Sequence, residues 1–238
     1  MNEREVKLFL AKVAHKIQRH DDMVQYIKDA VLLDARLKEE ERNLFYLAYK
    51  RAVDQKRNDI QFISVVIEHQ KCKMSSNSYV TRLETYKTEL SNELSRICYD
   101  LISLVDNQIL AYIELAEDKA YYYKMKADFY RYISESLPEK ERKGPSQKAT
   151  SLYEESIRAA KSSLSPTNPL YANIYLNYTV YLHEVLNIPA KAIDVAQEFI
   201  QKLNDISESN QDHFSRETDF VIAKMKANVE MWTGVKSD

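Results

Sequence analysis

Apolar residues recur every three or four positions along most of this chain, which is the spacing of an amphipathic α-helix. The clearest stripe begins after Asn77 and comprises Tyr79, Leu83, Tyr86, Leu90, Leu94, Ile97, Leu101 and Leu104. No segment alternates apolar and polar residues between turn signals, as a half-buried strand would. The pattern therefore predicts an all-α protein.

Capping residues and prolines indicate where these helices begin and end. Asn2 followed by Glu5 is an N-cap signature, and Asp21 or Asp22 can cap a second helix. The clearest break is 138–145, which contains two prolines and Gly144. We expect nine helices with short connections and antiparallel neighbours. After the first two, they are expected over about 39–68, 77–104, 115–136, 146–163, 169–186, 190–206 and 212–233.

Composition excludes several classes of enzyme. The 238 residues include only 2 glycines, where average usage would give roughly 17. Glycine-rich phosphate loops and the G-x-S-x-G elbow of hydrolases are therefore absent. The five histidines lack metal-ligand spacing, and no segment supplies a nucleophile, a base and an oxyanion hole together. We expect no catalytic residue, no metal site and no cofactor.

Charge and hydropathy limit the partners. The net charge is −2, from 34 basic and 36 acidic residues, which argues against nucleic-acid binding by a broadly basic surface. No apolar run approaches the roughly 20 residues of a membrane span. The N-terminal segment mixes charges with its apolar residues, and two cysteines are too few for a disulfide framework. These observations predict a cytoplasmic or nuclear protein.

Two predicted helices each carry a pair of cations seven residues apart. Lys50 and Arg57 lie on one helix, and Lys124 and Arg131 on the other. Seven residues are two helical turns, so each pair projects from one face. If the two faces meet, the cations can converge on one dianion, where arginine offers a planar fork for phosphate oxygens. The alternative interpretation is that each stripe is a solvated face with i,i+4 ion pairs.

Four segments, in this order, resemble the 14-3-3 family. They are EERNLFYLAYK at 40–50, KMKADFYRYISE at 124–135, PTNPLYANIYLNYTVYLHEVLN at 166–187 and NVEMWT at 228–233. The resemblance covers nearly the whole chain, but a second family signature is heavily degraded. The chain is therefore identified as a divergent member.

The resemblance implies one domain over residues 1–238, in which nine antiparallel helices form a concave amphipathic groove. Helices one to four would form the floor and the dimer contact. Helices five to nine would form the groove wall, with a break near 138–145, and 233–238 a short tail. The implied function is a phosphoserine- and phosphothreonine-peptide-binding adaptor, without enzymatic activity, that regulates client proteins in signalling.

The resemblance also implies the site residues. Lys50, Arg57, Arg131 and Tyr132 match the phosphate-binding set. Asn177 and Asn228 match asparagines that hydrogen-bond the ligand's main chain, although each could be a solvated side chain. The full peptide-binding set is Lys124, Leu176, Asn177, Val180, Glu184, Val221, Lys224, Asn228, Met231 and Trp232. Its apolar members form the groove wall in this reading, with ordinary core as the alternative.

Some positions depart from the family pattern. Gln61 stands where the family usually has a third arginine near the phosphate, and Lys224 where it has a groove leucine. Leu182 and His183 replace aromatic residues. Lys224 could select acidic residues flanking the phosphosite, or its stem could cover apolar wall while its ammonium reaches water.

The expected dimer, formed with a second copy or another family member, involves five positions. Arg19 and Glu93 match a charge pair across its interface, and Tyr86 an aromatic in it. Asp22 would face Glu89, which creates a repulsion between two carboxylates.

A tetratricopeptide-like scaffold that binds unmodified acidic or C-terminal peptide tails is the alternative function. The absence of a repeat of about 34 residues argues against it. A purely structural bundle is a third reading, which the two mid-helix asparagines disfavour.

Overall fold

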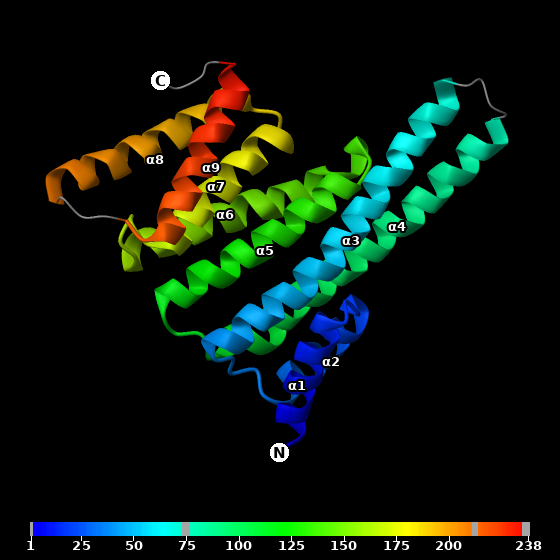
Figure 1. Ribbon diagram of the computed structural model, residues 1–238, viewed down its shortest axis with the longest axis horizontal. Coiled ribbons are helices and arrows are strands. Elements are labelled where there is room, and N and C mark those ends of the chain that lie inside the picture. The colour runs from blue at the N-terminus through cyan, green and yellow to red at the C-terminus, as the bar shows by residue number, and fades with distance from the viewer. Residues whose placement is uncertain (1, 73–76, 211–213, 235–238) are drawn as a thin grey trace. The chain divides into compact units, whose positions relative to one another are not determined.

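The computed structural model describes residues 2–72, 77–210 and 214–234, and these residues form nine α-helices and no strand (Figure 1). The all-α prediction is confirmed. The helices are α1 (Glu3–Lys16), α2 (His20–Leu33), α3 (Glu39–Cys72), α4 (Asn77–Leu104), α5 (Ala116–Ser136), α6 (Lys143–Ser163), α7 (Pro169–Glu184), α8 (Pro189–Asn210) and α9 (Arg216–Thr233). Shorter helical turns, η1 (Val105–Ile109), η2 (Leu110–Tyr112) and η3 (Glu139–Glu141), join α4 to α5 and α5 to α6.

Local capping determines several of these boundaries. The Asn2 and Glu5 side chains each accept a hydrogen bond from the other residue's backbone N–H, at 2.8 and 3.0 Å, so the predicted N-cap is confirmed. Asn168 caps α7, whose first residue is Pro169. The predicted cap of the second helix was wrong: α2 begins at His20, and its N-cap residue, Arg19, makes no side-chain capping bond.

Other boundaries differ by a few residues. The third helix continues to Cys72 and the eighth to Asn210, each four residues beyond the expected end. Both extensions lack a proline or glycine that would stop the helix. The sixth helix begins at Lys143, inside the expected break. The connection between α5 and α6 is therefore only residues 137–142, which include η3. Residues 211–213 and 235–238, which belong to the expected last helix and tail, lie outside the described residues.

The chain forms two compact units. The first comprises Met1–Ile113 and Tyr132–Lys143, and the second Glu114–Arg131 and Gly144–Asp238. The α5 helix contributes to both. The expected single domain over residues 1–238 stays a prediction.

In the first unit, α1 and α2 form a hairpin and the long helices α3 and α4 lie side by side (Figure 1). Apolar side chains at helical spacing are buried here, among them Met23 and Ile27 of α2 and Phe45 of α3. The Tyr49 hydroxyl donates to Asp100 of α4 at 2.6 Å, so a polar link accompanies the apolar packing of α3 on α4.

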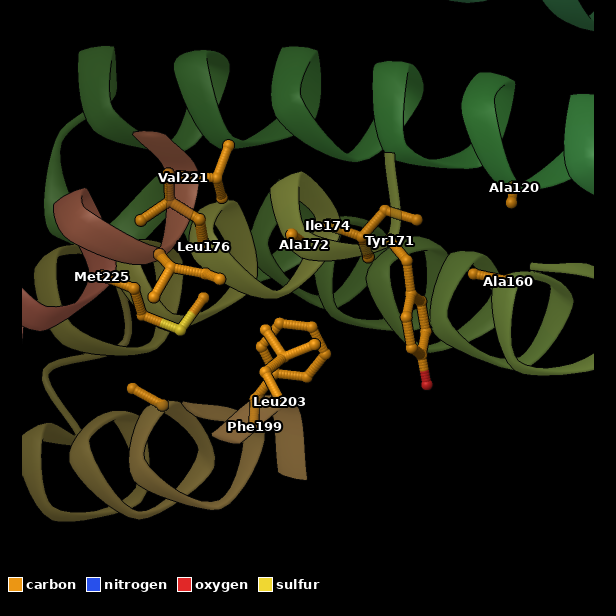
Figure 2. Close-up of a cluster of buried hydrophobic side chains, with 12 residues drawn as sticks. Ala120, Ala160, Tyr171, Ala172, Ile174, Leu176, Phe199, Leu203, Val221 and Met225 are labelled. Atoms are coloured by element: carbon orange, nitrogen blue, oxygen red, sulfur yellow. The ribbon is translucent and has the colours of Figure 1, made fainter. Parts of the chain in front are cut away.

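In the second unit, α7 lies at the centre of an apolar cluster (Figure 2). The cluster contains Tyr171, Ala172, Ile174 and Leu176 of α7, Phe199 and Leu203 of α8, and Val221, Ile222 and Met225 of α9, with Ala120, Ala160 and Ala196. Each large side chain buried there stabilises the fold by about 1.5–3 kcal/mol. A second cluster around Tyr153, Tyr178 and Tyr181 joins α6 to α7.

Candidate functional site

In the first unit, two α3 cations meet one aromatic ring. The Lys50 ammonium lies 5.3 Å and the Arg57 guanidinium carbon 4.7 Å from the centre of the Tyr132 ring. Tyr132 is buried, so its face is a low-dielectric surface on which both cations are attracted to the ring's π-electrons. Three of the four residues expected to bind phosphate are therefore neighbours.

Both of these cations also have carboxylate partners. Lys50 pairs with Asp54, one turn further along α3. Arg57 Nη2 lies 2.6 Å from Glu135 Oε2, and Arg57 Nη1 lies 3.8 Å from Asp54 Oδ1. The i,i+4 ion pair of the alternative interpretation is thus present. Asp54 and Glu135 were not expected as site residues; the spacing of Asp54 from Lys50 could have identified it.

A cleft of about 350 Å³ adjoins these residues. It is lined by Arg57, Asn58, Ile60, Gln61, Leu94, Tyr132, Glu135 and Ser136. Arg57 is the one cation in that lining, because the neutral Gln61 stands where the family usually has a third arginine. An anion bound in this cleft would meet the Arg57 guanidinium, which already pairs with the Glu135 carboxylate.

In the second unit, donors from α5, α6 and α7 surround a fully buried carboxylate of α5. Asp128 has no exposed surface. Lys124 Nζ lies 2.7 Å from Asp128 Oδ2, and the Tyr153 hydroxyl donates to Oδ1 at 2.6 Å. Asn177 Nδ2 donates to both carboxylate oxygens, at 2.8 and 3.0 Å. Burial raises the pKa of Asp128, but the Lys124 and Arg131 charges and the hydrogen bonds to Asp128 lower the pKa by more. The pKa of Asp128 therefore lies below its ordinary value, and the group is ionised.

Arg131 belongs to the same network. Its Nη2 lies 4.0 Å from Asp128 Oδ1, and its Nε donates to the Tyr153 hydroxyl at 3.3 Å. The Arg131 side chain is 10% exposed and that of Lys124 13%. The second cation pair is therefore mostly buried around an anion, which a solvated face would not show. Burial and the Asp128 charge raise the pKa of the Tyr153 phenol, which remains a neutral donor.

Arg131 and Tyr132 are consecutive residues of α5 that belong to different units. Of the expected phosphate-binding residues, Lys50, Arg57 and Tyr132 therefore belong to the first unit and Arg131 to the second. Convergence of all four on one dianion stays a prediction.

The expected apolar groove wall divides between core and surface. Leu176 and Val221 lie in the apolar cluster of Figure 2, and Val180 packs against it. Met231 of α9 is 69% exposed. Asn228, three residues earlier, is half-buried. The alternative of ordinary core thus describes the positions of Leu176 and Val221.

A different face of α9 points outward. Phe220 is 61% exposed, and the Lys224 ammonium lies 4.3 Å from the centre of its ring. Phe220, Lys224 and Met231 follow helical spacing and form what we call the α9 outer face. The expected set contained Val221 in place of Phe220. The i,i+4 relation of Phe220 to Lys224 is a sequence signal that could have identified it.

An aromatic stack joins the end of α7 to the end of α9. The His183 imidazole and the Trp232 indole lie 4.3 Å apart at an interplanar angle of 9°. His183 Nδ1 is 2.8 Å from Glu184 Oε1. The buried Trp232 Nε1 has no hydrogen-bond partner among the described residues. Two expected peptide-binding residues, Glu184 and Trp232, are therefore linked by the histidine that replaces a family aromatic.

The residues expected at a dimer interface have partners within the chain or face outward. Arg19 Nε lies 2.6 Å from Asp22 Oδ2, and Lys56 Nζ lies 2.5 Å from Glu93 Oε2. Tyr86 and Glu89 of α4 are exposed.

The described residues contain neither a metal-ligand cluster nor a candidate membrane span. No cluster of three or more histidine, cysteine, aspartate or glutamate side chains there could hold a metal ion. No helix in the described ranges has both the length and the hydropathy needed to cross a membrane.

Comparison with known proteins agrees with the segments quoted above. The model of the family described as 14-3-3 protein matches residues 10–233. The chain is 31% identical over 235 residues to 14-3-3 protein 7 of Solanum lycopersicum, covering 97% of this chain and 91% of that protein. It is 30% identical over 233 residues to the 14-3-3-like protein GF14 epsilon of Arabidopsis thaliana, covering 98% and 91%. With 14-3-3 protein 3 of Entamoeba histolytica it shares 28% over 239 residues, covering 99% and 98%. At this level of identity, and with its nine described helices, the chain is a divergent member of the 14-3-3 family.

Proposed function

We propose that this chain binds segments of client proteins that contain phosphoserine or phosphothreonine, and that it regulates those clients in signalling. Membership of the 14-3-3 family supports phosphopeptide-binding adaptor function in general, without catalysis. The observation that carries the proposal for this chain is the placement of Lys50 and Arg57 on the face of Tyr132.

The chemistry of that arrangement suits a phosphate group. A phosphorylated side chain carries about −1.5 to −2 charge at pH 7 and three acceptor oxygens. Lys50 and Arg57 offer a point charge and a planar fork on one surface. Each charge-assisted hydrogen bond contributes roughly 1.5–3 kcal/mol. A single carboxylate, such as Glu135, carries less charge than phosphate and would be displaced from Arg57 by it.

Titration calorimetry with one phosphoserine peptide and its unphosphorylated twin tests the proposal. The wild type should bind only the phosphorylated form, and Arg57→Glu with Arg131→Glu should abolish that binding without changing far-UV helix content. Arg51→Glu with Arg158→Glu is the matched control, since both residues are exposed and the change in net charge is the same. Equal affinity of the wild type for both peptides would refute the proposal and favour a scaffold for unmodified tails.

We further propose that the chain dimerises, with a second copy or another family member, as the family supports. The exposed apolar side chains of Phe9 in α1, of Ile17 directly after α1 and of Tyr86 in α4 are suited to such a contact. A cytoplasmic or nuclear location belongs to the same proposal.

A further inference from the structure

Asp128 is the one fully buried carboxylate of the second unit's described residues, and three of the residues around it, Lys124, Arg131 and Asn177, are expected to contact a client. It touches Asn177, expected on the ligand's main chain, and lies beside Arg131, expected on its phosphate. A buried charge with several donors is expensive to form and must be compensated by its partners. The role that this arrangement gives Asp128 in client binding rests on the proposed function.

The contact with Asn177 determines the orientation of that amide. The Nδ2 amino group donates to the Asp128 carboxylate, with its nitrogen 2.8 and 3.0 Å from the two oxygens. An asparagine side chain has one amino group and one carbonyl oxygen, on opposite sides of Cγ. Because the amino group is held against Asp128, the carbonyl oxygen points away from it. Asn177 is thereby prepared to accept a hydrogen bond, as from a main-chain N–H.

The contact with Tyr153 extends the same control to Arg131. The Tyr153 hydroxyl donates to Asp128 at 2.6 Å and accepts from Arg131 Nε at 3.3 Å. Since a hydroxyl has one hydrogen, its donation to Asp128 leaves its lone pairs for Arg131. One edge of the guanidinium is thus held within the protein, which restricts the directions that its remaining N–H groups can take.

We propose that Asp128 is the positioning residue of the client site: without touching the ligand, it orients Asn177 directly and Arg131 through Tyr153. A site that is oriented before the ligand arrives loses less conformational entropy on binding. The competing role is that Asp128 only balances the charge of Lys124.

The two roles predict opposite effects of Asp128→Asn on the affinity for a phosphopeptide. Asp128→Asn removes a negative charge beside two cations. If Asp128 acts only as a counter-charge, the variant should bind a phosphopeptide more tightly, and the gain should shrink as salt screens it. If Asp128 positions Asn177 and Arg131, binding should weaken in spite of the added positive charge.

A second variant avoids a change in a buried charge. Tyr153→Phe keeps the packing and removes only the hydroxyl between Asp128 and Arg131. Tyr181→Phe is its matched control, because Tyr181 is also fully buried, lies 5.3 Å from the Tyr153 ring and uses its hydroxyl on the Ser146 carbonyl at 2.6 Å. Both variants lose a buried hydrogen bond, but only Tyr153→Phe touches the Asp128 network.

The experiment measures the dissociation constant of one phosphoserine peptide at low and high salt, with the melting temperature of every variant. We expect Asp128→Asn to weaken binding at least tenfold and Tyr153→Phe about fivefold, while Tyr181→Phe stays within twofold of the wild type. Tighter or unchanged binding by Asp128→Asn, or equal effects of Tyr153→Phe and Tyr181→Phe, overturns the inference. If Asp128→Asn does not fold, the two tyrosine variants decide. A wild type that ignores phosphorylation refutes the proposed function instead, and this is seen before any variant is compared.

Discussion

Arg57 of α3 and Glu135 near the end of α5 form a hydrogen-bonded ion pair, with 2.6 Å between Nη2 and Oε2. The two residues are 78 positions apart in the sequence. Glu135 lies at a guanidinium edge that an incoming phosphate would need. The pair is partly exposed, so its stability is modest and depends on salt.

Removing the Glu135 charge should therefore tighten phosphopeptide binding. For Glu135→Gln we expect a two- to fivefold lower dissociation constant in titration calorimetry, consistent with about 0.5–1 kcal/mol for a partly exposed pair. The gain should shrink at high salt. Glu139→Gln, a change at an exposed position on η3, is the control and should have no effect. Weaker binding by Glu135→Gln would mean that Glu135 holds Arg57 in its binding orientation.

The α9 outer face offers a test of sequence preference. Lys224→Leu should remove a preference for acidic residues beside the phosphosite and add one for apolar residues, by roughly 0.5–1 kcal/mol. The reason is that Lys224 lies over the exposed Phe220 ring, where its ammonium remains accessible. Phosphopeptide arrays measure this. Lys226→Leu, also exposed on α9, is the control. Identical array profiles for Lys224→Leu and the wild type would leave Lys224 as a cover for apolar surface.

Glu89 should limit the strength of the proposed dimer. Glu89→Lys should lower the dissociation constant of the dimer in analytical ultracentrifugation, because it removes a carboxylate expected to face Asp22. The gain should be small, since Arg19 already pairs with Asp22 at 2.6 Å within the chain. Glu198→Lys, exposed on α8, controls for net charge. If wild type and Glu89→Lys both sediment as monomers at micromolar concentration, the assigned interface is wrong.

Asp128 should also make stability depend on pH. Its pKa in the folded chain is lowered, so its contribution is complete above the unfolded-state pKa of about 3.9 and is lost as pH falls through the lower folded value. Asp128→Asn should cost about 3 kcal/mol of unfolding free energy near pH 7, and the difference from wild type should narrow below about pH 4. Denaturant unfolding at several pH values measures it. The exposed Asp194→Asn should show no such trend, and a constant gap for Asp128→Asn would contradict the assignment.

The helices could be predicted because their signals are local. The Asn2–Glu5 cap lies within four residues of sequence, and the stripe after Asn77 repeats along the whole of α4. Helix ends were less certain where no glycine or proline intervenes, as at Cys72. There, tertiary packing and not local sequence sets the length.

The site was predictable only as far as it is local. The i,i+4 spacing of Lys124 and Asp128 indicates an ion pair, but whether that pair is solvated or buried depends on Tyr153 and Asn177 from other helices. The face of α9 was missed by one residue, since Phe220 and Val221 differ by only 100° around the helix. Which of the two enters the core is decided by the α7 and α8 side chains packed against it.

The stack of His183 on Trp232 gives this protein a built-in optical signal. Trp232 is the only tryptophan in the sequence, so all of the indole fluorescence comes from one ring that lies 4.3 Å from an imidazole. A ligand that separates the two rings, or that shields the indole from water, would change the emission of the whole chain. Client binding near this stack could therefore be followed on the unlabelled wild type, in real time and without a reporter attached to either partner.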